Sequence, residues 1–89
     1  MVEDIETTRK RLYMRSIRRG IKEMDLILKG FADLHLSQMD EGQLAVYDQL
    51  LSENDHDLYQ WVSGQSAVPP TYADLMAQIS EGAVGVTKP

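Results

Sequence analysis

The residues best suited to chemistry in this chain surround one glycine, in the stretch Arg18-Arg19-Gly20-Ile21-Lys22-Glu23. A guanidinium is a rigid planar fork of hydrogen-bond donors, and a carboxylate accepts such donors. If Arg19 and Glu23 lie side by side at a corner, Gly20 lets another backbone come close to them. The stretch therefore predicts a docking site for a partner. It offers neither a nucleophile nor a proton relay.

Positive charge is concentrated in the same part of the chain. Seven of the nine Lys and Arg residues fall within positions 9–22, so the first 22 residues carry about +4 and the rest about −9, in a chain of net charge −5. Four of these cations have the spacing of a single helical face. They are Arg11, Arg15, Arg18 and Lys22. No acid lies four residues away to relieve their repulsion, so the face is predicted to serve binding.

The other titratable side chains give weaker signals. His35 and His56 are 21 residues apart, without metal-ligand spacing, and the absence of cysteine excludes disulfides, thiolate metal sites and cysteine nucleophiles. Asp55 and Asp57 resemble a carboxylate pair, but acids are ordinary in the first turn of a helix. There is no Gly-rich phosphate loop and no nucleophile elbow. We therefore expect no enzyme activity, no metal and no tightly bound cofactor.

Helical spacing dominates the chain, and strand signals are nearly absent. Breakers divide it into five short helices, and 89 residues suffice for one domain with a small core. We predict an all-α fold, a compact five-helix bundle over residues 1–81, followed by a disordered tail over residues 82–89.

The first two helices are expected at about residues 6–18 and 21–36. Thr7 or Thr8 is the predicted N-cap of the first, and Gly20 its predicted left-handed C-cap. The second helix is the most apolar and is predicted to be central. The apolar residues that make it so are Met24, Ile27, Leu28, Phe31, Leu34 and Leu36.

The remaining helices begin at local caps, and Gly64 is expected to end the fourth. The predicted caps are Asp40 with Gln43 as a capping box, Asn54 or Asp55, and Thr71 after Pro69-Pro70. Tyr47 and Trp61 are interpreted as core residues, and His56 as a surface residue.

Several motifs occur together in this order along the five helices. They are Arg19-Gly20-Ile21-Lys22-Glu23, Met39-Asp40-Glu41-Gly42-Gln43-Leu44, Tyr47-Asp48-x-Leu50-Leu51 and Asp57-Leu58-Tyr59-x-Trp61. With them the chain resembles the SdhE/YgfY family of flavinylation factors, related to the mitochondrial succinate dehydrogenase assembly factor, over roughly residues 11–79. The resemblance implies a five-helix assembly chaperone that is not itself an enzyme.

The resemblance also implies a partner. Such proteins bind the flavoprotein subunit of succinate dehydrogenase, or of fumarate reductase, and promote the covalent bond between FAD and a histidine of that subunit. FAD then belongs to the partner, and the chain is expected to be a monomer that reaches a membrane only through that partner. The candidate contact residues are Arg19, Gly20 and Glu23, then Arg18 and Asp25, with Arg15 and Arg11 from the basic face. The residues left open between core and rim are Tyr47, Asp48, Asp57, Tyr59 and Trp61.

Two other classes of function stay open. Members of this family have also been described as CptB-type antitoxins, regulatory proteins that oppose a small toxin through protein–protein contacts. The cations of residues 9–22 would also suit a nucleic-acid binder, but the overall negative charge argues against one. The start of the chain has no secretory or transit-like pattern, and no apolar run approaches the ~20 residues of a membrane span. A bacterial cytoplasm is therefore the expected location.

Overall fold

The computed structural model describes residues 3–83, and within them the chain forms five α-helices and no strand. The α-helices are α1 (Ile5–Ser16), α2 (Lys22–His35), α3 (Glu41–Leu51), α4 (Asp55–Val62) and α5 (Ala73–Gly82). Two short 3-10 helices, η1 (Leu36–Gln38) and η2 (Pro70–Tyr72), lead into α3 and α5. The predicted all-α bundle in a single small domain is confirmed.

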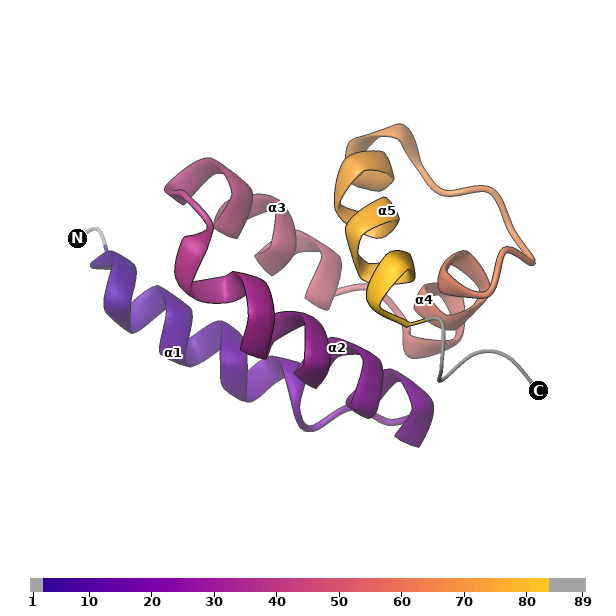
Figure 1. The fold of residues 1–89 in the computed structure, drawn as a ribbon, viewed down its shortest axis with the longest axis horizontal. Helices are drawn as coiled ribbons and strands as arrows, with labels where there is room; N and C mark the ends of the chain where they lie inside the picture. The colour runs from indigo at the N-terminus through magenta and orange to yellow at the C-terminus, as the bar shows by residue number, and fades with distance from the viewer. Residues whose placement is uncertain (1–2, 84–89) are drawn as a thin grey trace.

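The helix α2 connects the two ends of the bundle. It runs alongside α1 in the opposite direction, and α1 also packs on α3 (Figure 1). At the other end of the molecule, α2 contacts α4 and α5, which also pack on each other. The central place predicted for this helix is therefore confirmed.

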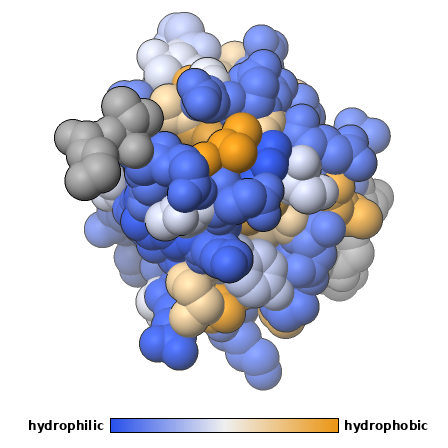
Figure 2. Space-filling view, turned by 90° about the vertical axis from the view of Figure 1, so that its left-hand side faces the viewer, coloured by the Kyte–Doolittle hydropathy of each residue, from blue (hydrophilic) through white to orange (hydrophobic). Residues whose placement is uncertain are grey.

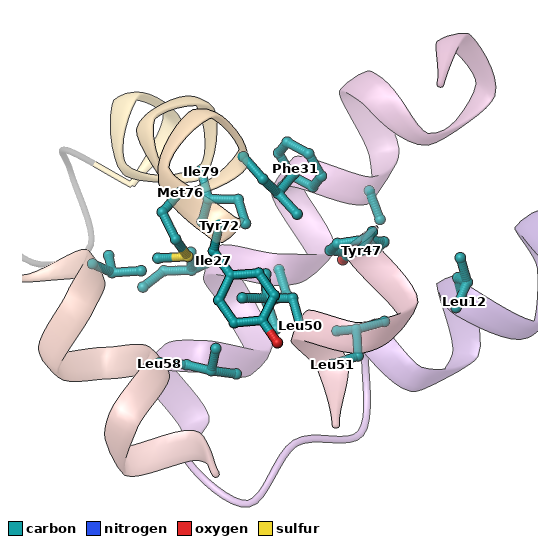
Figure 3. Packing of buried hydrophobic residues seen from close by; sticks show 14 of the residues in the cluster. Leu12, Ile27, Phe31, Tyr47, Leu50, Leu51, Leu58, Tyr72, Met76 and Ile79 are labelled. Atoms are coloured by element: carbon teal, nitrogen blue, oxygen red, sulfur yellow. The ribbon is translucent and has the colours of Figure 1, made fainter. Parts of the chain in front are cut away.

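The core is built from one side of each helix. Figure 3 shows Leu12 of α1, Phe31 of α2, Tyr47 of α3 and Ile79 of α5 pointing into the same interior. All four are at most 5 % exposed. On the outside, the end of the molecule seen in Figure 2 is mostly hydrophilic, with small separate hydrophobic groups. Such a surface is ordinary for a folded domain.

One apolar residue of α2 lies on the surface. Leu34 is 67 % exposed. The buried residues of α2 include Leu28 and Phe31, and the half-buried His35 has its ring 4.9 Å from that of Phe31. Leu34 thus adds to the apolar character of α2 without being part of the core.

Local capping explains the start of α3 and the two ends of α4. The Gln43 amide donates to Asp40 Oδ1 at 2.8 Å, and the Asp40 amide donates to Gln43 Oε1 at 2.9 Å, which completes the predicted capping box. Asn54 Oδ1 accepts from the His56 amide at 2.7 Å and caps α4. Gly64 follows α4 with a φ of +82°, a conformation that favours glycine.

Three other predicted helix ends were wrong. The N-cap of α1 is Asp4, whose carboxylate accepts from the Thr7 amide at 2.8 Å, so an acid takes the place expected for a threonine. The same helix ends at Ser16, and Gly20 has no positive φ, so it is not a left-handed cap. The α5 helix continues from η2 without a side-chain cap from Thr71.

The packed structure extends slightly beyond the predicted domain boundary. The α5 helix includes Gly82, and Ala83 is fully buried. The rest of the predicted tail, residues 84–89, lies outside the described residues. Within residues 3–83, a helix with the length and hydropathy of a bilayer span is not found.

Candidate docking site

Arg19 fastens the loop between α1 and α2 to the rest of the protein. Its side chain is only 10 % exposed, and its Nε donates to Asp55 Oδ1 at 2.8 Å. Nη1 donates to the carbonyl oxygens of Arg15 at 3.2 Å and Leu51 at 3.1 Å, and Nη2 donates to that of Glu53 at 3.4 Å. The donor fork thus joins the end of α1 to the junction of α3 and α4, and is not presented to solvent.

Gly20 meets the other oxygen of the same carboxylate. Its amide donates to Asp55 Oδ2 at 2.6 Å. A Cβ added at position 20 would lie 3.1 Å from that oxygen, closer than most such contacts in proteins. The space that this glycine leaves is therefore already used within the chain, by Asp55.

Three charged side chains beside this loop face solvent. Arg18, Lys22 and Glu23 are exposed, and none makes a hydrogen bond or ion pair within the described residues. We call these three residues the docking corner. The nearby Asp25 is half-buried, and its Oδ1 accepts from the Arg19 amide at 3.4 Å. The corner thus presents mixed charge where the loop held by Arg19 and Asp55 meets the first turn of α2.

The predicted basic face is divided by the structure. Arg11 and Arg15 lie on α1, but the helix ends at Ser16, so Arg18 and Lys22 do not continue its face. The expectation of one cationic helix face with four members was therefore wrong. It failed because helical spacing was extended past the true end of the helix.

Acids from elsewhere in the chain neutralise Arg11 and Arg15, the two members of the predicted basic face that lie on α1. Arg15 pairs with Asp48 of α3. Arg11 Nη2 lies 3.1 Å from Asp48 Oδ2 and 2.9 Å from Glu3 Oε1. The hydrogen bonds from Arg11 hold the pKa of the Glu3 carboxyl below its ordinary value. Asp48, left open by the sequence, thus holds α1 to α3.

Tyr47 belongs to the core, as the sequence predicted. Its side chain is fully buried, and its hydroxyl lies 2.6 Å from Ser16 Oγ. Because Ser16 Oγ donates to the Leu12 carbonyl oxygen at 2.8 Å, the tyrosine is the donor of the shared bond. Burial raises the pKa of Tyr47 to about 12.

The other residues left open divide between core edge and surface. Trp61 and Tyr59 are half-buried, and the Trp61 ring lies 5.8 Å from that of Tyr72. Tyr72 is one of the buried core residues labelled in Figure 3. Asp57 and His56 are exposed in the first turn of α4. No group of three or more acidic or histidine side chains within residues 3–83 is placed to hold a metal ion.

Comparison with known proteins identifies the family. Residues 10–83 match the family described as the flavinator of succinate dehydrogenase. The chain belongs to this family. The match includes Arg19, Asp55 and the docking corner.

The curated relatives of this flavinator-family chain carry the name "Succinate dehydrogenase assembly factor 2, mitochondrial". The protein of Aspergillus flavus is 49 % identical over 69 residues, which cover 78 % of this chain and 23 % of that protein. The protein of Saccharomyces cerevisiae is 40 % identical over 84 residues, 89 % of this chain and 52 % of that protein. The protein of Drosophila grimshawi is 37 % identical over 82 residues, 89 % of this chain and 56 % of that protein. The chain thus spans from about a quarter to just over half of their length.

For this member of the flavinator family, sequence reasoning missed the role of Asp55. We interpreted this acid as an ordinary helix-start residue, which it also is, as the first residue of α4. Its second role depends on Arg19, which lies 36 residues away. Helical periodicity describes only neighbours along the chain, so it carried no signal for this pair.

Proposed function

We propose that this chain binds the flavoprotein subunit of succinate dehydrogenase during assembly and promotes covalent attachment of FAD to a histidine of that subunit. Membership of the flavinator family supports an assembly role. The docking corner carries the rest of the proposal. Arg18, Lys22 and Glu23 are charged, exposed and without a hydrogen-bond or ion-pair partner within residues 3–83. They lie where the loop that Arg19 and Asp55 hold in place meets the first turn of α2.

Such a corner suits a helper whose substrate is another protein. Flavin attachment requires a histidine held close to the flavin and stabilisation of the charge that develops, so it depends on positioning and electrostatics. Both reacting groups belong to the flavoprotein. A helper therefore accelerates the step if it binds the competent conformation of the flavoprotein more tightly than other conformations. A loop that is already fixed loses little conformational entropy on docking.

The groups that form the bond between FAD and the histidine belong to the flavoprotein and not to this chain. The sequence contains no Gly-rich phosphate loop with which to hold FAD tightly. The ion pairs and hydrogen bonds of Arg9, Arg11, Arg15 and Arg19 also reduce the positive charge available to nucleic acid. Fumarate reductase as a second client, a monomeric state and a bacterial cytoplasm remain predictions.

Covalent flavin on the succinate dehydrogenase flavoprotein, measured by in-gel fluorescence after denaturation, tests the proposal. The host lacks its own factor and receives the chain, its Glu23→Ala variant or a Glu41→Ala control. Glu23 and Glu41 are both exposed acids in the first turn of a helix, so the variants are matched in chemistry and position.

We expect fluorescence with the unaltered chain and with Glu41→Ala, and little or none with Glu23→Ala. Equal fluorescence with all three would mean that the docking corner takes no part in flavin attachment. No fluorescence with any of them, with each protein folded and expressed, would overturn the flavinylation role. Rescue from a small toxin would then be tested as the antitoxin alternative.

A further inference from the structure

All the large hydrophobic side chains that are exposed within residues 3–83 lie on the hairpin of α1 and α2. They are Met14 at 45 %, Leu26 at 54 % and Leu34 at 67 % exposure. None lies on α3, α4 or α5. Single exposed leucines are common on protein surfaces. Here, however, these exposed hydrophobic side chains all lie on the hairpin that carries the docking corner, so they are not spread evenly over the surface.

A glycine separates the two exposed leucines of α2. Gly30 lies in the middle of α2, away from both helix ends, and it is exposed to solvent. A Cβ added there would meet nothing within 4 Å. No internal contact therefore requires a glycine at this position. Because glycine within a helix costs about 1 kcal/mol relative to alanine, the position reduces stability without an intramolecular benefit.

The four residues around this point form a socket. Leu26, Lys29, Gly30 and Asp33 have the i, i+3, i+4, i+7 spacing of the hole that receives a side chain from a facing helix. Lys29 Nζ and Asp33 Oδ2 are 2.9 Å apart and form one polar edge. Leu26 provides an apolar edge, and Gly30 leaves the backbone open at the floor.

The socket is continuous with surfaces on both sides. Glu23 of the docking corner precedes Leu26 by three residues and lies on the same face of α2. On the other side, Asp33 lines a shallow groove between α1 and α2 together with Tyr13 and Met14. The exposed apolar groups therefore extend the charged corner along the hairpin.

We propose that this face of α2 receives an apolar side chain from an amphipathic helix of the flavoprotein subunit, seated on Gly30 between Leu26 and Leu34. The inference rests on the proposed function, and its occupant follows from the continuity with Glu23.

A second copy of the chain fits less well. Two leucines supply little of the roughly 1,000 Å² that a stable interface buries, and two chains of net charge −5 repel each other.

Substitution of Gly30 separates binding from folding, because the two effects have opposite signs. Gly30→Ala and Gly30→Leu add side chains where the structure leaves open space in a helix, so both should raise Tm, Gly30→Ala by about 4 °C or more. Gly30→Leu should weaken binding to the purified flavoprotein subunit by at least about tenfold, because it fills the socket. The control is Ala77→Leu, which adds the same side chain at an exposed position of α5 and should leave affinity unchanged.

Calorimetric titration measures binding to the flavoprotein subunit, and sedimentation equilibrium measures whether the chain forms a dimer. Binding of Gly30→Leu equal to that of Ala77→Leu would overturn the inference and leave the proposed function standing. A dimer of the unaltered chain that Gly30→Leu dissociates would overturn it in favour of a second copy. Absence of flavoprotein binding by the unaltered chain would overturn the inference and the proposed function together.

Discussion

The carboxylate of Asp55 holds both the side chain and the loop of Arg19. One oxygen accepts from Arg19 Nε at 2.8 Å, and the other accepts from the next amide, that of Gly20, at 2.6 Å. The first residue of α4 thereby determines where the loop between α1 and α2 lies. Within the motif from Arg19 to Glu23, the arginine and the glycine serve the architecture, and the last two residues face the solvent.

Asp55→Ala should destabilise the fold. The Asp55 and Arg19 side chains are 17 % and 10 % exposed, so the substitution leaves a mostly buried guanidinium without its counter-charge. Removing one partner of such a pair costs about 2–4 kcal/mol of the free energy of unfolding. Urea denaturation measures the loss. Asp57→Ala, an exposed acid two residues away, is the control and should change the free energy by less than about 0.5 kcal/mol. Equal effects of the two variants would contradict the role of Asp55.

Gly20→Ala should also destabilise the protein, although less. The new Cβ would lie 3.1 Å from Asp55 Oδ2, and this carboxylate is held by two short bonds that resist movement. We expect a loss of about 1 kcal/mol, which outweighs the entropic gain that alanine brings to an unstrained site. The measurement is the urea midpoint. A variant as stable as the unaltered chain would mean that the Asp55 carboxylate moves aside easily to make room for the new Cβ.

The stability of the protein should fall at high pH because of Tyr47. Burial raises its pKa to about 12 in the folded state, above the ordinary value of 10, so its neutral form favours folding. This contribution is complete below pH 10 and is lost as the pH rises toward 12, at up to about 1.4 kcal/mol per pH unit.

Comparison with Tyr47→Phe isolates this contribution. The variant loses the bond to Ser16, which costs about 1 kcal/mol near neutral pH. Between pH 10 and pH 12, its free energy of unfolding should fall less steeply than that of the unaltered chain. Parallel curves from chemical denaturation at a series of pH values would contradict the assignment.

The cations of the docking corner should matter more for partner binding than those of α1. Among the residues that the structure describes, Arg18 and Lys22 have no hydrogen-bond or ion-pair partner, whereas Arg11 is held by Glu3 and Asp48. Arg18→Ala and Lys22→Ala should each slow association with the flavoprotein subunit by about 3- to 10-fold and weaken its dependence on salt. Arg11→Ala should change the rate by less than about twofold. Stopped-flow association at several salt concentrations provides the test.

The sequence predicted those parts of the fold that depend on neighbouring residues. The capping box of Asp40 and Gln43, the Asn54 cap and the turn at Gly64 are all decided within a few residues, and all three are present. The core position of Tyr47 also followed from its place on an apolar stripe.

The features that the sequence did not predict depend on distant segments. Asp48 and Asp55 neutralise arginines more than 30 residues away, so the spacing of the cations alone exaggerated the free positive charge. Leu34 and Leu36 are both apolar residues at the end of the second helical segment, but packing buries Leu36 and leaves Leu34 exposed. Pattern reasoning thus singled out the stretch from Arg18 to Glu23, but it carried no signal that the Arg19 side chain is mostly buried.

The attachment of α1 to the rest of the bundle depends heavily on charge. Leu12 and Ser16 are the only residues of α1 that are buried, and Arg9, Arg11 and Arg15 hold the helix to η1 and α3. Ion pairs at a surface weaken as ionic strength rises, whereas apolar contacts do not. Concentrated salt should therefore loosen α1 before α2 to α5, and its amides should exchange with solvent deuterium first.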